Sequence, residues 1–190
     1  VTDSNVYALY AAWFERYFPN AEIFVLPAGE ENKNFASLQA ILEKMAGAGL
    51  RRNSRLFAVG GGVVGDLTGF LASTFMRGID FYNVPTTFLS MVDSSIGGKT
   101  GIDFCGVKNS VGTFYQPKGV LVDVDTLKTL SDRQFSNGLA ESIKMSATLD
   151  EELFELLETG DFRNNILSGT VFCWKICIGW NLPKKGPEHR

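Results

Sequence analysis

Glycines cluster at residues 60–65, between a short apolar run and a longer apolar segment. Gly60, Gly62 and Gly65 fit the spacing G-x-G-x-x-G, in which glycines let the backbone approach a pyrophosphate and the next helix offers free N–H groups. A structural glycine turn is the alternative, since this motif alone is weak. The acid that usually contacts the ribose stands about 20 residues further on, and Asp80 has that spacing but precedes its strand. The cluster therefore favours nucleotide binding without establishing it.

A second group of polar residues follows the next apolar run. Thr86 and Thr87 are followed by Asp93, a pair of glycines and Lys99. The letters Gly-Lys-Thr around Lys99 resemble the end of a Walker phosphate loop, but such a loop needs a glycine where Asp93 stands. Hydroxyls and a lysine around a glycine turn still suit a phosphate or a polyhydroxylated ligand, and Lys108 adds a second cation. We therefore favour a binding site over the alternative, a polar surface loop.

A third group contains Glu141 and Lys144, three residues apart in a segment with helical periodicity. On a helix these two side chains share one face. An exposed ion pair without a function is the alternative, and it is the more frequent meaning of such spacing. The small residues Gly138 and Ala140 allow another element to approach this helix closely.

The elements that carry these residues follow from the spacing of apolar side chains. Helices are predicted at residues 6–18, 35–48 and 67–76, and strands at residues 21–26, 55–59 and 81–84, with a strand end before the first helix. Alternating strands and helices are typical of an α/β fold with a parallel sheet and right-handed crossovers. Ligands in such sheets bind beyond the carboxyl ends of the strands, which directs attention to the loops after Val59 and Val84.

The pattern changes near Ser131. Residues 135–158 have helical spacing, as one helix or as two helices broken near residues 148–150. We therefore predict an α/β domain at residues 1–130 and a truncated helical domain at residues 131–190. Within the second domain, residues 159–190 lack clear helical periodicity.

Composition excludes several classes of partner. The net charge is −3, so no bulk positive field attracts nucleic acid or an anionic membrane. No run approaches the roughly 18 apolar residues of a membrane span. Three cysteines, an odd and low number, fit a reducing compartment better than a secreted disulfide framework. We expect a cytoplasmic protein, with a plastid as the alternative.

Taken together, the three groups resemble the 3-dehydroquinate synthase family over about residues 1–158. The matching stretches are GGGVVGD at 60–66, MRG at 76–78, VPTT at 84–87, DSSIGGKTG at 93–101, KN at 108–109, QP at 116–117 and GLAESIK at 138–144. Their order and spacing fit, and no single motif carries the resemblance. The form DSSIGGKT favours this family over the sugar-phosphate cyclases that share its fold.

The resemblance implies a Rossmann-like domain followed by a helical domain, and an enzyme of the shikimate pathway. The family converts 3-deoxy-D-arabino-heptulosonate 7-phosphate to 3-dehydroquinate with loss of phosphate. It uses NAD+ catalytically together with a divalent metal, zinc or cobalt. A substrate hydroxyl is oxidised, the transient ketone acidifies the neighbouring C–H, phosphate leaves and the ketone is reduced again. The expected partners are a phosphorylated sugar acid and a second copy of the chain, with no nucleic acid and no membrane.

The resemblance also assigns residues. The predicted NAD contacts are Asp3, Asn5, Glu30, Lys33, Gly61, Gly62, Val63, Asp66, Thr86, Thr87 and Thr129. The predicted catalytic residues are Asp93, Lys99 and Lys144, and the predicted substrate contacts are Lys108, Asn109 and Arg77, the last serving the neighbouring subunit. Glu141 is the predicted metal ligand. The resemblance therefore favours a functional role for the Glu141–Lys144 pair over an exposed ion pair without a function.

The printed sequence departs from the family pattern after residue 158. The other two metal ligands of the family are histidines in the helical domain, whereas the only His here, His189, stands in a polar tail. A catalytic zinc site uses three protein ligands. We therefore expect an incomplete enzyme that is inactive alone. The alternatives are a non-catalytic NAD-binding relic, a related sugar-phosphate cyclase, or a metal-dependent alcohol dehydrogenase, which has no need of the lysines around the second group.

Overall fold

A five-stranded parallel sheet forms the centre of the computed structural model, which describes residues 1–158. Its strands are β1 (Thr2–Asp3), β2 (Val25–Leu26), β3 (Arg55–Gly60), β4 (Asp80–Pro85) and β7 (Gly119–Val120). Their order is β2-β1-β3-β4-β7, and every pair is parallel. The predicted α/β class with a parallel sheet is confirmed.

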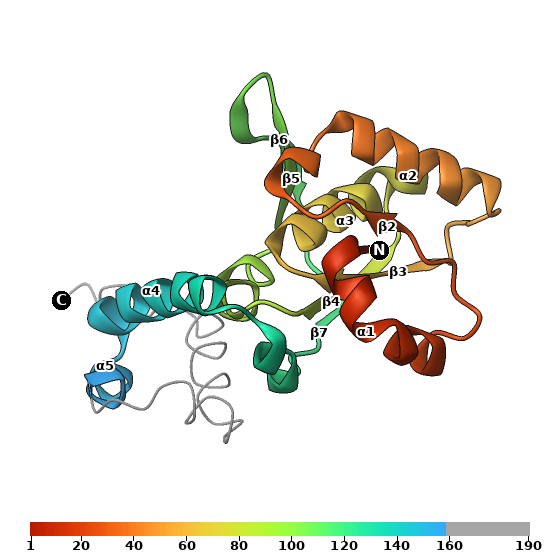
Figure 1. Cartoon of the computed structure of the whole chain (residues 1–190). Coiled ribbons are helices and arrows are strands. Elements are labelled where there is room, and N and C mark those ends of the chain that lie inside the picture. The colour runs from red at the N-terminus through yellow and green to blue at the C-terminus, as the bar shows by residue number, and fades with distance from the viewer. Residues whose placement is uncertain (159–190) are drawn as a thin grey trace.

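Helices cover both faces of this sheet (Figure 1). The helices are α1 (Ser4–Tyr17), α2 (Phe35–Gly47) and α3 (Gly62–Thr74). Side chains in β3 alternate between the two faces: Leu56 and Ala58 pack with α2 and α3, whereas Phe57 and Val59 pack with α1. Each fully buried large side chain of this kind contributes roughly 1.5–3 kcal/mol to folding.

Side-chain caps fix where α1 and α2 begin. Asp3 Oδ1 accepts hydrogen bonds from the backbone N–H groups of Asn5 and Val6, at 2.9 and 3.0 Å. Asn34 caps α2 in the same way through Ser37 N, at 3.0 Å. A short 3-10 turn, η1 (Glu30–Asn32), precedes this second cap.

Two predicted boundaries were wrong. The strand at residues 21–26 is reduced to β2, because only Thr2 and Asp3 of β1 are available to pair with it. The helix predicted from residue 67 begins at Gly62, where Gly65 N donates to Gly61 O at 3.0 Å. Glycine is a poor helix former, so residues 62–65 carry no helical signal for that first turn.

The region after β4 holds structure that the sequence analysis missed. A π-helical turn, η3 (Ser90–Ser94), leads into an antiparallel hairpin of β5 (Lys99–Phe104) and β6 (Val107–Phe114). The hairpin turns at Cys105 and Gly106, which both have positive φ, as a tight two-residue hairpin turn requires. It packs against α3 through Ile102, which is fully buried.

The chain then returns to the sheet edge and leaves it as helices. Helix α3 had ended in a 3-10 turn, η2 (Phe75–Arg77). After β7 the chain forms a 3-10 segment, η4 (Val124–Thr129), and then the helices α4 (Asp132–Leu149) and α5 (Glu151–Glu158). Ser131 caps α4 and Asp150 Oδ1 accepts from Leu153 N at 3.0 Å, so the predicted break near residues 148–150 is confirmed. These helices extend away from the sheet (Figure 1). The predicted division into two domains stays a prediction, and its segment at residues 159–190 lies outside the described residues.

Candidate functional site

The order of the strands locates the site. The chain passes from β1 outward to β2 and then crosses back to β3, so the direction of winding reverses between β1 and β3. In open parallel sheets a crevice forms at such a switch point, outside the carboxyl ends of the strands. Asp3 ends β1 and Gly60 ends β3, so the predicted glycine turn lies at this crevice.

The glycine turn is shaped for close approach. A Cβ added at Gly61 would lie 3.0 Å from Thr87 Cγ2, and one added at Gly62 would lie 3.0 Å from Ser94 Oγ. Beside this turn, Thr86 Oγ1 and Ser94 Oγ are buried and find no hydrogen-bond partner among residues 1–158. Buried hydroxyls without partners are costly, so they point to a ligand that satisfies them.

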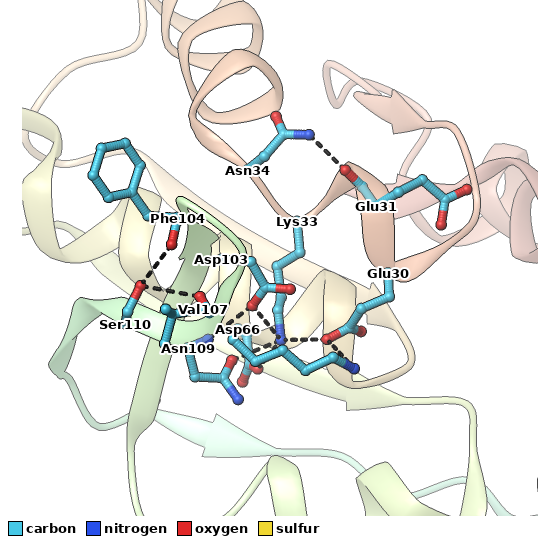
Figure 2. A network of polar contacts seen from close by, with 11 residues as sticks. Glu30, Glu31, Lys33, Asn34, Asp66, Asp103, Phe104, Val107, Asn109 and Ser110 are labelled. Carbon is cyan, nitrogen blue, oxygen red and sulfur yellow. Dashed lines mark hydrogen bonds and ion pairs between the residues drawn. The ribbon is translucent and has the colours of Figure 1, made fainter.

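Lys33 is the centre of a polar network beside the turn (Figure 2). Its ammonium is almost fully buried and contacts Glu30 Oε1 at 3.0 Å, Asp66 Oδ2 at 3.3 Å and Asp103 Oδ1 at 3.7 Å. It also donates to Asn109 Oδ1 at 2.7 Å. One buried cation thus joins the start of α2, helix α3 and the hairpin.

Burial and pairing act in opposite directions on the charges of this network. Burial disfavours the charged form of Lys33, but the hydrogen bond with Glu30 and the charges of Asp66, Glu30 and Asp103 outweigh it, so the pKa of Lys33 is raised. Burial raises the pKa of Asp66 to about 6, although Lys33 opposes this shift. Asp66 therefore changes its charge just below neutral pH.

A cleft of about 390 Å³ opens next to the network. Asp66 and Asn109 form one side of it, and Asp93, Ser94 and Lys99 form another. It is polar and holds carboxylates and a cation from three different elements, so it suits a charged, hydroxylated ligand. Lys108, which is largely exposed and next to Asn109 in the chain, has its Nζ 3.6 Å from Glu30 Oε1.

Helix α4 brings the third group of residues to the same region. A Cβ added at Gly138 would lie 2.6 Å from the backbone nitrogen of Leu89, so only glycine lets α4 pack directly on the segment before η3. This packing places Glu141 and Lys144, which form an ion pair, near Asp93, whose charge acts on Lys144. The pKa of Lys144 is raised, chiefly by its hydrogen bond to Glu141.

Other predicted residues do not line the polar cleft. Thr129 contacts α1, with its Oγ1 2.6 Å from the hydroxyl of Tyr10. Arg77 is exposed at the far end of α3, whose 13 residues span about 20 Å. Asp3 already uses its carboxylate as a helix cap, and Asn5 is exposed beside it.

Sequence reasoning missed two participants in the site, Asp103 and Ser94. Asp103 meets Lys33 only because the hairpin folds back over α3, a contact between residues 70 positions apart. Ser94 belongs to a matching stretch but carried no signal of its own. An unpartnered buried hydroxyl is visible only once its surroundings are known.

A larger cavity lies elsewhere. It has about 730 Å³ and is lined mainly by apolar side chains, among them Trp13, Phe18, Phe57 and Tyr82, on the α1 side of the sheet. It shares only Thr86 with the predicted site residues. Its chemistry is apolar, so we assign the candidate site to the smaller polar cleft.

Neither a metal cluster nor a membrane span is found in the described part of the chain. Residues 1–158 contain no group of three or more His, Cys, Asp or Glu side chains arranged to hold a metal ion. Within the same residues, no helix has the length and apolar character needed to cross a membrane.

Comparison with known proteins gives concordant matches. The family model for the 3-dehydroquinate synthase N-terminal region matches residues 23–137. A 3-dehydroquinate synthase of Prochlorococcus marinus (strain MIT 9515) is 53% identical over 154 residues, which cover 81% of this chain and 42% of that protein. The chain thus spans less than half the length of this relative.

Solved structures of related cyclases are also similar. ValA, the 2-epi-5-epi-valiolone synthase from Streptomyces hygroscopicus subsp. jinggangensis 5008, solved with NAD+ and Zn²⁺, aligns with a TM-score of 0.87 at 31% identity. The alignment covers 94% of this chain and 52% of ValA. A 2-deoxy-scyllo-inosose synthase complexed with carbaglucose-6-phosphate, NAD+ and Co²⁺ aligns with a TM-score of 0.73 at 30% identity, over 88% and 51% of the two chains.

Proposed function

The chain belongs to the 3-dehydroquinate synthase family, and on that premise we propose that it is the NAD-binding part of such an enzyme. The whole protein would convert 3-deoxy-D-arabino-heptulosonate 7-phosphate to 3-dehydroquinate with release of phosphate. One observation carries the proposal: the family match at residues 23–137 includes the glycine turn, the Lys33 network and the residues of the polar cleft. Family likeness and local chemistry therefore converge on one edge of the sheet.

The residues at the switch point fit a dinucleotide. Gly61 and Gly62 would let the pyrophosphate approach the N-terminus of α3, where backbone N–H groups are free. Thr86 Oγ1 and Ser94 Oγ, which lack partners among the described residues, would bind its polar groups. When bound, NAD+ supplies reversible hydride transfer at a substrate carbon. The related ValA and 2-deoxy-scyllo-inosose synthase were both solved with NAD+.

The residues of the polar cleft would hold the substrate. Lys99 and Lys108 offer cations to a phosphate, and Asn109 offers an amide to hydroxyls. Lys144 stays protonated at neutral pH because its pKa is raised, so it provides fixed positive charge beside Asp93. These groups would bind and orient the substrate in the cleft.

Arg77 would serve a second copy of the chain. It is exposed at the end of α3 opposite the glycine turn, and it does not line the cleft of its own chain. Its backbone has a φ of 65°, a strained conformation for a residue other than glycine. A homodimer in which the Arg77 side chain reaches the substrate of the partner subunit would explain this strained backbone conformation.

The metal required by the family does not fit residues 1–158 alone. Glu141 is one carboxylate, and no further ligands gather around it among those residues. We therefore assign no catalytic step to a metal on this part of the chain. The proposal for the 190 residues as printed is binding of NAD without turnover. The non-catalytic relic remains its alternative, with the same expectation for NAD.

A related sugar-phosphate cyclase is the second candidate function. The favouring observation is the structural similarity to ValA, with a TM-score of 0.87. The higher sequence identity, 53%, is to a protein named 3-dehydroquinate synthase. The two functions differ in the substrate, since the second would use a phosphorylated sugar without a carboxylate.

Thr86→Val tests the cofactor proposal. The purified chain is titrated with NAD+ by calorimetry, and its free energy of unfolding is measured in urea. Thr86→Val removes a buried hydroxyl that has no partner among residues 1–158, so we expect a gain in stability of about 1 kcal/mol together with a loss of NAD+ affinity of about tenfold.

Thr68→Val is the matched control. Thr68 Oγ1 is equally buried and unpartnered within the described residues, but it lies inside α3, away from the glycine turn. We expect the same gain in stability and unchanged NAD+ affinity. Equal affinities for the chain and both variants, or no binding by any of them, would contradict the assignment. Metal-dependent phosphate release from the heptulosonate phosphate by the pure chain would contradict the absence of turnover.

A further inference from the structure

The hairpin contains an irregularity directly over the Lys33 network. Ile102 pairs with Val111 and Phe104 pairs with Val107, so one residue of β5 faces three residues of β6. The residue on β5 is Asp103. The strand opposite must bulge, and at its centre Asn109 has a φ of 52°, in the left-handed region. Such bulges commonly re-aim side chains next to active sites.

Asp103 fastens this bulge on two sides (Figure 2). Its Oδ1 accepts a hydrogen bond from the backbone N–H of Asn109 at 2.8 Å, which satisfies the amide that the bulge removes from the ladder. Its own backbone N–H donates to the carbonyl of Lys33 at 2.8 Å, which ties the hairpin to the start of α2. No other described residue is hydrogen-bonded to both Asn109 and the Lys33 backbone.

The bulge determines where two cleft residues lie. With its backbone held by Asp103, Asn109 turns its Oδ1 to Lys33 Nζ, at 2.7 Å, and faces the cleft beside Asp66. Lys108 lies near Glu30. If the bulge relaxed, these side chains would move with the backbone, since Asp103 is the described residue that accepts the hydrogen bond of the Asn109 backbone N–H.

For holding the bulge, the negative charge of Asp103 is less important than the hydrogen-bond acceptor that its Oδ1 provides. Lys33 already has Glu30 at 3.0 Å and Asp66 at 3.3 Å, and Asp103, at 3.7 Å, is the most distant carboxylate. Two nearer carboxylates suffice to neutralise one ammonium. An amide oxygen at the same position would still accept from the Asn109 N–H.

We propose that Asp103 is a positioning residue of this site: it holds the β6 bulge so that Asn109 faces the cofactor and substrate cleft and Lys108 lies beside Glu30, and it acts through its hydrogen bond and not its charge. The inference rests on the proposed function for the identity of the ligand. The arrangement of the hairpin stands independently of that ligand.

The test compares Asp103→Asn with Asp103→Ala in the full chain. NAD+ affinity is measured by calorimetry, and protection of the Asn109 amide is measured by hydrogen exchange. Asp103→Ala is expected to bind NAD+ on the order of tenfold more weakly and to lose Asn109 protection, because a small misplacement of binding groups is costly. Asp103→Asn is expected to restore both quantities to within about twofold of the unsubstituted chain.

Asp80→Ala is the matched control. Asp80 also lies 3.7 Å from a lysine ammonium, that of Lys118, but at the opposite end of β4. We expect it to leave NAD+ affinity and Asn109 protection unchanged. Loss of affinity in Asp103→Asn equal to that in Asp103→Ala would overturn the assignment, since it would make the charge decisive. Full Asn109 protection in Asp103→Ala would overturn it as well.

The two proposals fail in distinguishable ways. If the unsubstituted chain binds no NAD+, the proposed function fails, and the exchange of the Asn109 amide alone decides whether Asp103 holds the bulge. If the chain binds NAD+ and Asp103→Ala binds equally well, the proposed function survives and the positioning role is refuted.

Discussion

At the scale of single residues, the site is dominated by one buried cation and the acids around it. Lys33 is 3% exposed, and it contacts carboxylates that come from three separate parts of the chain. A buried ammonium without any partner would be costly, but the loss of one of these three carboxylates still leaves Lys33 compensated. Stability and ligand binding are therefore coupled at this point.

Asp66→Asn is predicted to change the pH dependence of stability. Burial raises the pKa of Asp66 from 3.8 to about 6, so the folded chain holds its proton more tightly than the unfolded chain. Stability from this group is complete below pH 4 and is lost as the pH rises towards 6, by roughly 3 kcal/mol for about two pKa units. Asn stays neutral, so the variant should gain stability over the unsubstituted chain only as pH exceeds about 4.

Urea unfolding at pH 4.5, 5.5 and 7.5 measures this difference. Asp80→Asn is the control. It also removes one acid, but at the start of β4, whereas the site lies beyond the end of that strand. We expect Asp66→Asn to bind NAD+ more weakly while folding more stably at pH 7.5. A variant that is less stable than the unsubstituted chain at pH 7.5 would show that pairing with Lys33 outweighs burial.

The sequence predicted most residue types of the site but not their contacts. Gly61, Gly62 and Thr86 lie where their motifs indicated, beyond the ends of buried strands. The roles of Asp103 and of the Ser94 hydroxyl could not be predicted from the sequence, because they depend on neighbours that only the fold brings close. Spacing along a chain reports local structure, whereas these contacts are made across it.

At the scale of elements, the approach of α4 to η3 is the decisive contact. Phe88 and Phe135 stack with ring centroids 5.0 Å apart, and Gly138 lies directly against the backbone of Phe88 and Leu89. This contact places the Glu141–Lys144 pair near Asp93. The sequence analysis inferred that Gly138 allows a close approach, and the structure identifies the element that approaches.

Gly138→Ala is predicted to destabilise the chain. Alanine favours a helix over glycine by up to about 1 kcal/mol, but here its Cβ would meet backbone atoms that cannot yield, at a cost of roughly 1–3 kcal/mol. Gly47→Ala at the end of α2, where nothing lies within 4 Å, should instead be neutral or stabilising. Thermal unfolding of both variants decides the matter, and a stabilised Gly138→Ala would refute the tight contact.

The hairpin shows why some elements escape prediction. β5 and β6 contain glycines and short polar side chains, which are weak strand formers, and their turn at Cys105 and Gly106 is not one of the strongest turn signals. Helices α2 and α4 were predicted because an apolar face repeats over several turns. Long periodic segments are readable from sequence, and short irregular ones are not.

At the scale of the whole molecule, the hydrophobic core is divided. One cluster lies between the sheet and α2–α3, another under α1, and a third joins Phe88, Met91 and Val92 to α4 and α5. The third cluster crosses the predicted domain boundary near Ser131. The two predicted domains therefore share buried surface.

A chain shortened to residues 1–130 is predicted to be less stable than residues 1–158. It would expose Phe88, Met91 and Leu127, which are fully buried beside α4, and each such loss is worth roughly 1.5–3 kcal/mol. We expect a lower unfolding midpoint and stronger binding of a hydrophobic dye. Equal midpoints and equal dye binding for the two lengths would mean that residues 1–130 form an independent domain.

The order of the strands also determines when each strand can find its partner during translation. β1 lies between β2 and β3, and its partner Val59 is made 57 residues after Thr2. At roughly 5–20 residues per second, that gap lasts on the order of 3 to 11 seconds, during which β1 has no partner on its β3 side. Parallel pairing across such distances is intrinsically slow. The nascent chain thus passes through an interval in which one edge of β1 is unpaired and open to chaperones.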